Sequence, residues 1–320
     1  MPNLSVAVIA PIDYSKDLGK KGTSSDITLY DAKRGEATVS FIEATKYPER
    51  LAPLYFASAM AESALMVVDE VNAQFGECIL MLDAVGIKEG SIILRNLLTP
   101  DRIGPLVKGT VVEGFKFIEE NLAELREQYL DEAEKKSIPE EKGEVGSVPI
   151  DHHFNVRGVG TVALGHVVNG KILRHATLKA LPGKKEAVVR SIQKHDDDFE
   201  VAYKGDRVGL ALKNIDSDEL DRGSVLTNDP SIKEDKSFET TVKLIKFWPT
   251  PLKEGMVMHL GHWMQFIPAR ITSVENPANW RAPRVKFELE KELVHLPGGS
   301  AVLCYLEGGK LRIAGTARLP

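Results

Sequence analysis

The pattern of apolar residues changes once along the chain, near residue 140, and this change limits the folds that the sequence can adopt. Up to about residue 136, short apolar runs alternate with segments of helical spacing. Such alternation is typical of a doubly wound, mostly parallel sheet. After residue 147, short β-branched runs broken by glycines follow one another, which favours two β-barrels. The predicted fold class is therefore α/β plus all-β.

The first part of the chain is expected to alternate strands with helices. Lys33-Arg34-Gly35 is predicted to turn between the second and third strands. One helix should end on Gly86, and Asn121 should open another, with Glu124 in the capping-box relation. The expected strands are residues 4–10, 26–31, 37–44, 64–70, 91–96 and 115–121, and the expected helices are residues 48–63, with Pro48 near the start, 73–86 and 121–136.

Three domains are predicted, at residues 1–140, 147–230 and 236–320. Residues 137–147 mix proline and glycine with charges and are interpreted as a linker. Residues 231–236 are expected to separate the two barrels.

Charge is unevenly distributed along the chain, whose net charge is −5. Residues 1–146 carry 16 Lys+Arg against 25 Asp+Glu, residues 147–230 carry 12 against 12, and residues 231–320 carry 13 against 9. A polyanionic partner should be repelled by the first part and tolerated by the last. Chance unevenness between solvated surfaces is the alternative.

The remaining composition indicates a cytoplasmic protein without a metal site. Two distant cysteines fit a reducing compartment. No apolar run reaches the roughly 18 residues of a membrane span, and the N-terminus lacks the basic region of a signal peptide. His152 and His153 would point to opposite faces of a strand and so not share a metal ion. No catalytic constellation of serine, cysteine or histidine is present, so no catalytic residue is expected.

Three blocks in the second part resemble domain 2 of the elongation factor Tu superfamily, in the family's order. They are residues 149–172, 188–215 and 218–226. Gly158 and Gly160 in the first block are interpreted as positions where a barrel strand bends or bulges.

The rest of the chain resembles the same superfamily. Residues 256–275 and 285–319 are similar to strands of its domain 3. "LGKKGTSSDITLYD" (18–31), followed by "FIEATKYPERL" (41–51), looks most like the SelB-like elongation factors of methanogenic archaea. One branch of that group is named for pyrrolysine, an association that no motif here carries. The resemblance implies a G domain followed by two barrels, and delivery of aminoacyl-tRNA to the ribosome by a GTP switch.

The nucleotide site of this family is degraded at the phosphate loop. Such a loop needs glycines for close backbone approach, a lysine, and a Ser/Thr for Mg²⁺. In residues 10–17 the glycine positions hold Ala10 and Ser15, the magnesium position holds Asp17, and Lys16 alone matches.

The other nucleotide motifs are degraded too. The Asp-x-x-Gly loop aligns with residues 43–46, which keep a carboxylate at Glu43 and lose the glycine. The guanine-reading motif aligns with residues 95–98 and ends on Leu98, which cannot accept a hydrogen bond. Lys16, Asp17 and Glu43 are thus predicted to be vestigial nucleotide-binding positions. No cofactor is expected, unless the chain is a divergent GTPase that holds GTP and Mg²⁺.

By the same resemblance, domain 2 would hold the aminoacylated end of tRNA and domain 3 its stem backbone. For Arg207 the alternative is pairing with a nearby carboxylate, for His195 a solvated turn, and for Trp263 a place in the core. The candidates are Arg190, His195 and Arg207 in the second domain, and His262, Trp263, Gln265, Arg270 and Lys286 in the third.

The sequence therefore predicts a protein similar to translation elongation factors that binds tRNA or another translation component through its barrels, without a GTP hydrolysis cycle. One alternative is a divergent GTP-binding factor that delivers an aminoacyl-tRNA. The other is a protein-interaction scaffold whose acidic first domain binds a protein partner. The expected partners are tRNA, the ribosome or a protein, and neither DNA nor a membrane.

Overall fold

The computed structural model forms two compact units. The first comprises Met1–Ser137 and Tyr305–Ile313, and the second comprises Ile138–Cys304 and Ala314–Pro320. The residues described are 2–137, 143–275, 279–307, 309 and 311–320. The predicted end of the first domain, at residue 140, lies outside the described residues.

The first unit is built on a seven-stranded sheet in the order β2-β3-β4-β1-β5-β6-β7. β1 pairs in parallel with β4 and β5, β5 with β6, and β6 with β7, whereas β3 is antiparallel to both β2 and β4. The predicted mostly parallel sheet is confirmed. The strands are β1 (Asn3–Ile9), β2 (Lys20–Ser24), β3 (Thr28–Arg34), β4 (Ala37–Glu43), β5 (Ser63–Val68), β6 (Glu89–Leu94) and β7 (Lys116–Ile118).

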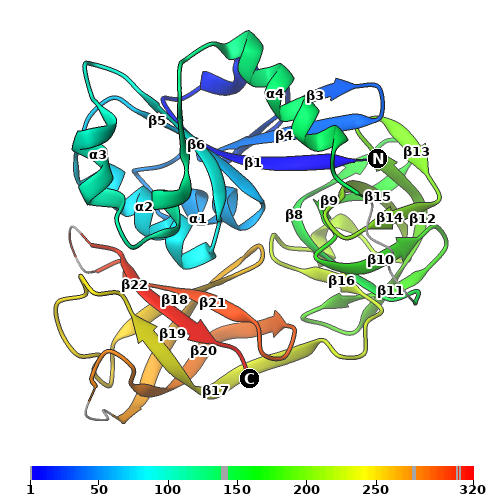
Figure 1. Ribbon diagram of the computed structural model, residues 1–320. Helices are drawn as coiled ribbons and strands as arrows, with labels where there is room; N and C mark the ends of the chain where they lie inside the picture. Colours follow the sequence, from blue (N-terminus) through cyan, green and yellow to red (C-terminus); the bar gives the residue numbers. More distant parts are fainter. Residues whose placement is uncertain (1, 138–142, 276–278, 308, 310) are drawn as a thin grey trace. The chain divides into compact units, whose positions relative to one another are not determined.

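Helices cover both faces of this sheet, with α4 on one face and α1 and α2 on the other (Figure 1). The Asn72 side chain caps α2 by accepting a 2.9 Å hydrogen bond from the backbone N–H of Phe75, and Gly86 ends the helix at φ 89°. The Asn121 side chain caps α4 in the same way, at 3.4 Å from the N–H of Glu124. The helices are α1 (Ala52–Ala59), α2 (Ala73–Val85), α3 (Pro100–Val107) and α4 (Leu122–Glu134), with 3₁₀ turns at η1 (Tyr14–Asp17) and η2 (Val111–Gly114).

Two expectations for this unit were wrong in detail. The helix expected over residues 48–63 runs from Ala52 to Ala59, and Pro53 rather than Pro48 lies in its first turn. The sequence reading also missed β2 and α3, because β2 is a short polar strand and α3 is eight residues long with Pro105 inside it.

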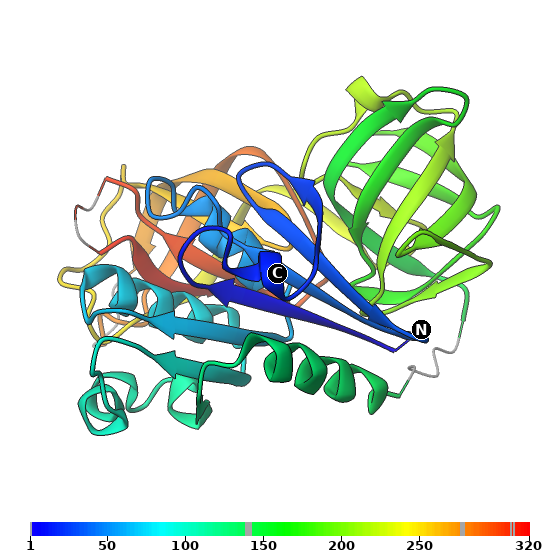
Figure 2. The same cartoon turned by 90° about the horizontal axis from the view of Figure 1, so that it is seen from above.

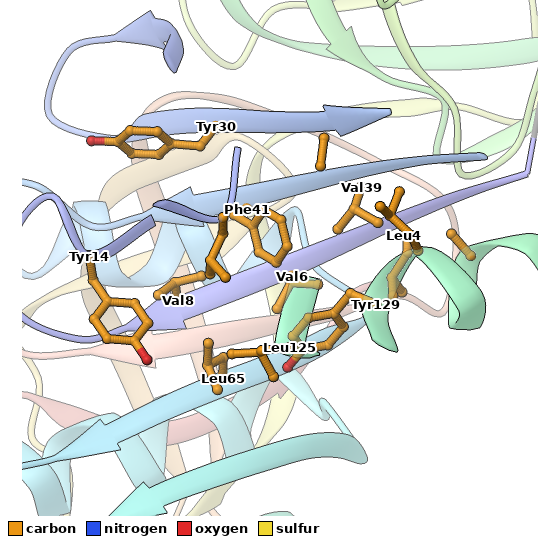
Figure 3. Packing of buried hydrophobic residues seen from close by; sticks show 14 of the residues in the cluster. Leu4, Val6, Val8, Tyr14, Tyr30, Val39, Phe41, Leu65, Leu125 and Tyr129 are labelled. Carbon is orange, nitrogen blue, oxygen red and sulfur yellow. The ribbon is translucent and has the colours of Figure 1, made fainter. Parts of the chain in front are cut away.

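One face of the central strand forms the core with α4 (Figure 3). Leu4, Val6 and Val8 alternate along β1 and are buried in the same cluster as Leu125 and Tyr129 of α4. The Tyr129 ring meets the ring of Phe41 edge to face, with centroids 5.6 Å apart. Burial of each such side chain contributes about 1.5–3 kcal/mol, so the period-two pattern of β1 fixes its place between α4 and the helices opposite.

The second unit begins with a closed ring of six strands in the order β8-β16-β11-β12-β15-β9, and β9 pairs back to β8. Figure 2 shows this barrel in green. Gly158 (φ 81°) lies in the turn between β8 and β9 and Gly160 (φ 98°) begins β9, and the bulge lies instead near Ile150–His152. The strands of this domain are β8 (Gly146–Val156), β9 (Gly160–His166), β10 (Asn169–Leu173), β11 (Thr177–Leu181), β12 (Lys185–Lys194), β13 (Asp197–Phe199), β14 (Val201–Tyr203), β15 (Arg207–Lys213) and β16 (Val225–Thr227), with the turn η3 (Ser217–Glu219) before β16.

A second closed barrel completes the unit, in the order β17-β20-β19-β18-β21-β22. The two predicted barrels are therefore confirmed. β17 starts at Lys233, so the expected boundary at residues 231–236 already includes its first residues. No helix in the described part of the chain is long and apolar enough to cross a membrane. The strands are β17 (Lys233–Leu244), β18 (Val257–His262), β19 (Gln265–Glu275), β20 (Arg284–His295), β21 (Ser300–Cys304) and β22 (Ile313–Arg318).

Candidate functional site

The loops after β1, β4, β5 and β6 share the carboxyl edge of the first sheet. In open α/β sheets, ligands bind at this edge where the strand order reverses. The reversal lies at β1, between β4 and β5. The candidate phosphate loop, residues 10–17, follows β1 directly and so lies where a nucleotide would be expected.

A side chain of the protein itself occupies this loop. The buried carboxylate of Glu43, at the end of β4, accepts hydrogen bonds from the backbone N–H of Asp13 at 3.0 Å and of Ser15 at 2.5 Å. Glu43 has no ion-pair partner among the described residues, so these two N–H groups are what compensate its burial. Backbone N–H groups of a phosphate loop bind phosphate oxygens in the same way. The Glu43 carboxylate thus takes the position of an anionic ligand.

The loop conformation depends on interactions with β3. Asp13 adopts a left-handed φ of 62°, and its carboxylate accepts a 2.7 Å hydrogen bond from the hydroxyl of Tyr30. That hydrogen bond lowers the pKa of Asp13. Lys16 and Asp17 lie in the single turn η1 with exposed side chains. Of the three vestigial positions named from the sequence, the structure therefore joins Glu43 to the loop and leaves Lys16 and Asp17 in solvent.

No long helix follows the loop. After the four residues of η1 the chain enters β2, and a Cβ at Gly19 would lie 2.9 Å from the backbone of Asp31 on the neighbouring strand. Only glycine permits that approach. A phosphate site gains from the dipole of a helix N-terminus, and a single 3₁₀ turn supplies little of it.

A cavity of about 340 Å³ lies beside Glu43. Its lining contains three carboxylates, those of Glu43, Asp69 and Glu70, and no lysine, arginine or histidine among the described residues. The rest of the lining is mostly apolar and includes Phe75 and Cys78, whose thiol has its pKa raised to about 12 by burial. Such a lining disfavours a phosphorylated ligand, because nothing in it offsets negative charge.

The segment aligned with the guanine-reading motif forms a turn after β6. Arg95 pairs with Glu120 and, at 3.5 Å, with Asp69, so its charge is used within the domain. Asn96 and Leu97 adopt left-handed φ angles of 52° and 61°. The Leu97 side chain is 95% exposed. This turn presents no side-chain acceptor in the place of the motif's final aspartate.

In the second domain, Arg207 is part of a buried charged pair. Its guanidinium donates two hydrogen bonds to the carboxylate of Asp151, which is 2% exposed. Burial opposes ionisation of Asp151, but the Arg207 charge and the hydrogen bonds hold its pKa well below the usual range. Burial, aided by the charge of Arg207, lowers the pKa of the nearby His166 to about 3. The carboxylate partner expected for Arg207 exists, but it is 56 positions away rather than adjacent.

The other candidates of this domain lie nearer the surface. Arg190 is exposed on β12 and donates a 3.2 Å hydrogen bond to the carbonyl of Val159. His195 is half-buried at the turn after β12, with a φ of 48°. The Nδ1 atoms of His152 and His153 contact Asp151 and Ser217 respectively, so the two rings have separate partners. Among the described residues, no group of three potential ligands converges as a metal site.

In the third domain, the candidates divide by burial. His262 is 7% exposed, and its Nδ1 lies 2.9 Å from the carbonyl of Ser300. Gln265 is 5% exposed and bonds to both the N–H and the C=O of Val294. Trp263 packs against a small buried apolar cluster that includes Val294 of β20. All three side chains therefore have partners within the protein.

Arg270 and Lys286 remain exposed on the outer surface of the third domain. Arg270 lies opposite Glu288 in the β19–β20 register, and Lys286 is two residues from Glu288 on the same face. The face is therefore mixed in charge, with Glu239 opposite Lys286 on β17.

The sequence alone did not predict the pairing of Glu43 with the loop amides or the exposure of the Leu97 side chain. For the first, the one available signal was a carboxylate at the end of a buried strand.

Comparison with known proteins gives a consistent set of similarities. The family model "Elongation factor Tu domain 2" matches residues 160–227. An uncharacterized protein of Methanocaldococcus jannaschii is 36% identical over 321 residues and is matched along the whole of both chains. The selenocysteine-specific elongation factor of the same organism is 27% identical over 285 residues, which are 83% of this chain and 61% of that protein.

A solved structure has the same fold. Translation elongation factor SelB from Methanococcus maripaludis, in complex with a GTP analogue, superimposes with a TM-score of 0.83 at 22% identity. The match covers all of this chain and 79% of that one. This chain therefore spans about three fifths of the selenocysteine-specific relative and about four fifths of the SelB structure.

Proposed function

We propose that this chain, which belongs to the elongation factor Tu superfamily as a SelB-like member, is a translation factor that works without a cycle of GTP binding and hydrolysis. We propose further that it binds tRNA, or another translation component, through its two β-barrels.

The hydrogen bonds of Glu43 with the N–H groups of Asp13 and Ser15 are the observation that carries the first proposal. A nucleotide would need the same N–H groups for its phosphates. It would also bring several negative charges to a buried carboxylate that lacks a cationic partner in the described part of the chain. GTP would have to displace Glu43 from both hydrogen bonds before the loop could close on a phosphate.

The surroundings of the loop support the same conclusion. The adjoining cavity has three carboxylates and, among the residues that the structure describes, no cation in its lining. Arg95, which aligns with the start of the guanine-reading motif, is paired with Glu120. A Mg²⁺-bound triphosphate therefore lacks a phosphate cradle, a hydroxyl ligand for the metal and an acceptor for the base.

For RNA binding, the support comes from the exposed cations of the barrels. Three of the cations named from the sequence have charged groups that reach solvent, namely Arg190, Arg270 and Lys286. None of the three belongs to a buried ion pair among the described residues. Interactions of Lys and Arg with phosphates supply most of the affinity of nucleic-acid binding and make it salt-dependent. Arg207 and Asp151 would shape the second domain rather than bind the RNA backbone.

The nucleotide proposal is tested by calorimetric titration of the whole chain with GTP and GDP, with and without Mg²⁺. No heat at about 100 μM protein is expected, which places any Kd above roughly 1 mM. A micromolar signal that disappears in Lys16→Ala would overturn the proposal, and the chain would then be a divergent GTP-binding factor.

The RNA proposal is tested by fluorescence anisotropy with labelled tRNA between 50 and 200 mM KCl. The triple variant Arg190→Ala/Arg270→Ala/Lys286→Ala should weaken binding and reduce the salt slope by about one for each phosphate that no longer pairs with a cation. Lys88→Ala/Lys108→Ala/Lys116→Ala, which removes three exposed cations of the first domain, serves as the matched control. Equal weakening in the control, or no saturable tRNA binding by the wild type, would refute this second proposal.

A further inference from the structure

The carboxyl edge of the first sheet displays apolar side chains in a regular arrangement. Ile12, Val71 and Leu97 each stand three residues past the last residue of a parallel strand, namely β1, β5 and β6. They are 64%, 43% and 95% exposed. Because β5 pairs with both β1 and β6, the three residues follow neighbouring strands and share one edge. We call these three residues the edge patch.

The backbone holds Leu97 outward at an energetic cost. Leu97 and its neighbour Asn96 both have left-handed φ angles, which bulky side chains rarely adopt. The turn is held by the amide of Asn96, which donates a 3.1 Å hydrogen bond to the carbonyl of Asp69, and by the N–H of Leu98, which donates to the carbonyl of Arg95 at 3.0 Å. Single exposed apolar residues are ordinary on protein surfaces, but three at the edge that this fold uses for ligands indicate a binding surface.

The loops around the edge patch are acidic. The loops that follow β1, β4, β5, β6 and β7 carry seven carboxylates against four cations, a net charge of −3. One of the cations, Arg95, is already paired with Glu120. The loops are residues 10–19, 44–51, 69–72, 95–99 and 119–121, and their carboxylates are Asp13, Asp17, Glu49, Asp69, Glu70, Glu119 and Glu120.

We propose that this edge binds a basic segment of another protein, with an apolar side chain of the partner packed against Leu97 and Ile12. The partner's lysines and arginines would complement the net charge of −3, which would repel a nucleic acid or a nucleotide. This proposal goes beyond the proposed function and does not require that the barrels bind tRNA. The edge that would hold a nucleotide in a GTPase would here hold a protein.

The probe is a labelled twelve-residue peptide of four leucines and eight lysines, titrated against the full chain by fluorescence anisotropy. Two companion peptides separate the apolar contribution to affinity from the electrostatic one. One has serine in place of leucine, and the other has glutamate in place of lysine. Saturable binding of the first, at least tenfold tighter than either companion, is expected. Equal binding of the serine peptide would overturn the role of the edge patch.

Leu97→Asn is the decisive variant, because asparagine accepts left-handed φ angles and lacks the apolar surface. It should weaken the leucine–lysine peptide about tenfold and raise the thermal midpoint of the first domain. Leu106→Asn changes an exposed leucine on α3, outside these loops, and should leave peptide affinity unchanged. Unchanged affinity in Leu97→Asn, or an equal decrease in both variants, would overturn the proposal.

Two further results would also overturn it. Direct binding of labelled tRNA that Leu97→Asn changes as much as it changes peptide binding would show that the edge accepts nucleic acid. Self-association of the wild type in sedimentation equilibrium, abolished by Leu97→Asn, would show an interface between copies of this chain instead. Failure of the peptide test leaves the calorimetric and tRNA tests of the proposed function standing, since they use other ligands and other variants.

Discussion

Removing the Glu43 carboxylate should loosen the loop after β1 and create an empty anion site. In Glu43→Ala, two charge-assisted hydrogen bonds disappear, at 3.0 Å and 2.5 Å. Ser15 is fully buried, so its N–H would stay unsatisfied at a cost of about 1–3 kcal/mol, whereas Asp13 is exposed and its N–H can turn to water. The lost charge-assisted hydrogen bond to Ser15 adds to this cost, and the removal of a buried charge offsets part of it. We therefore expect the free energy of unfolding to fall by about 3 kcal/mol. Glu43→Gln keeps one acceptor oxygen, so its free energy of unfolding should fall by about half as much.

The assay must report on the first domain by itself. The tryptophans, Trp248, Trp263 and Trp280, all belong to the third domain, so tryptophan fluorescence would follow the wrong part of the chain. Hydrogen exchange of peptides that cover residues 8–18, read by mass spectrometry, measures local opening directly. A loss of about 3 kcal/mol corresponds to exchange faster by about two orders of magnitude.

Added phosphate tests whether the Glu43 carboxylate acts as an internal anion. With Glu43 absent, added phosphate should bind the freed N–H groups and slow exchange in the variant, by about tenfold if the phosphate concentration is ten times Kd. Phosphate also stabilises folded proteins in general, so the wild type at equal ionic strength is the reference. Exchange in Glu43→Ala that equals the wild type, or that responds to phosphate no more than the wild type does, would show that the carboxylate does not act as an internal anion.

Three further predictions follow from other parts of the structure. Gly19→Ala should destabilise the first domain by about 1–3 kcal/mol, because its Cβ would lie 2.9 Å from the backbone of Asp31. The control Gly76→Ala, whose Cβ would lie in open space on α2, should stabilise the domain by up to about 1 kcal/mol. Hydrogen exchange of peptides from the sheet compares the two variants. His262, with a pKa lowered to about 4, takes up its proton more readily when unfolded, so its contribution to stability is present above pH 6.5 and is lost as the pH falls towards 4. Urea unfolding followed by tryptophan fluorescence should show about 2 kcal/mol of this loss at pH 5, and His262→Gln should remove it; an unchanged pH dependence in that variant would contradict the assignment. Asp151→Asn should cost the second domain about 3–5 kcal/mol by leaving Arg207 buried without its counter-charge, measured by thermal unfolding against the exposed control Asp221→Asn.

The sheet and barrels could be read from the sequence because their patterns are local. Strand β1 is a continuous apolar run, as a strand covered on both faces requires, and the break near residue 140 separates two different periodicities. The capping residue Asn121 and the terminating Gly86 were identifiable for the same reason. Helix α3 was not, since Pro105 and a length of eight residues hide its period.

The site was harder to predict because its interactions join residues far apart in sequence. Glu43 reaches Ser15 across 28 positions, and Arg207 reaches Asp151 across 56. The sequence identified Glu43 as the remnant of a metal loop, but whether its carboxylate faces outward or turns back onto the phosphate loop depends on the left-handed Asp13. His262 and Gln265 illustrate the opposite difficulty, because polar residues on a barrel strand look like surface positions until the packing around them is known.

The central position of β1 has a consequence for biosynthesis. β1 is made first, yet it pairs with β4 and β5, and β5 is complete only at Val68, 59 residues after Ile9. At about 5–20 residues per second, this apolar strand waits roughly 3–12 s for its second neighbour. The order of translation thus sets how long this apolar strand must be shielded before its second neighbour can cover it.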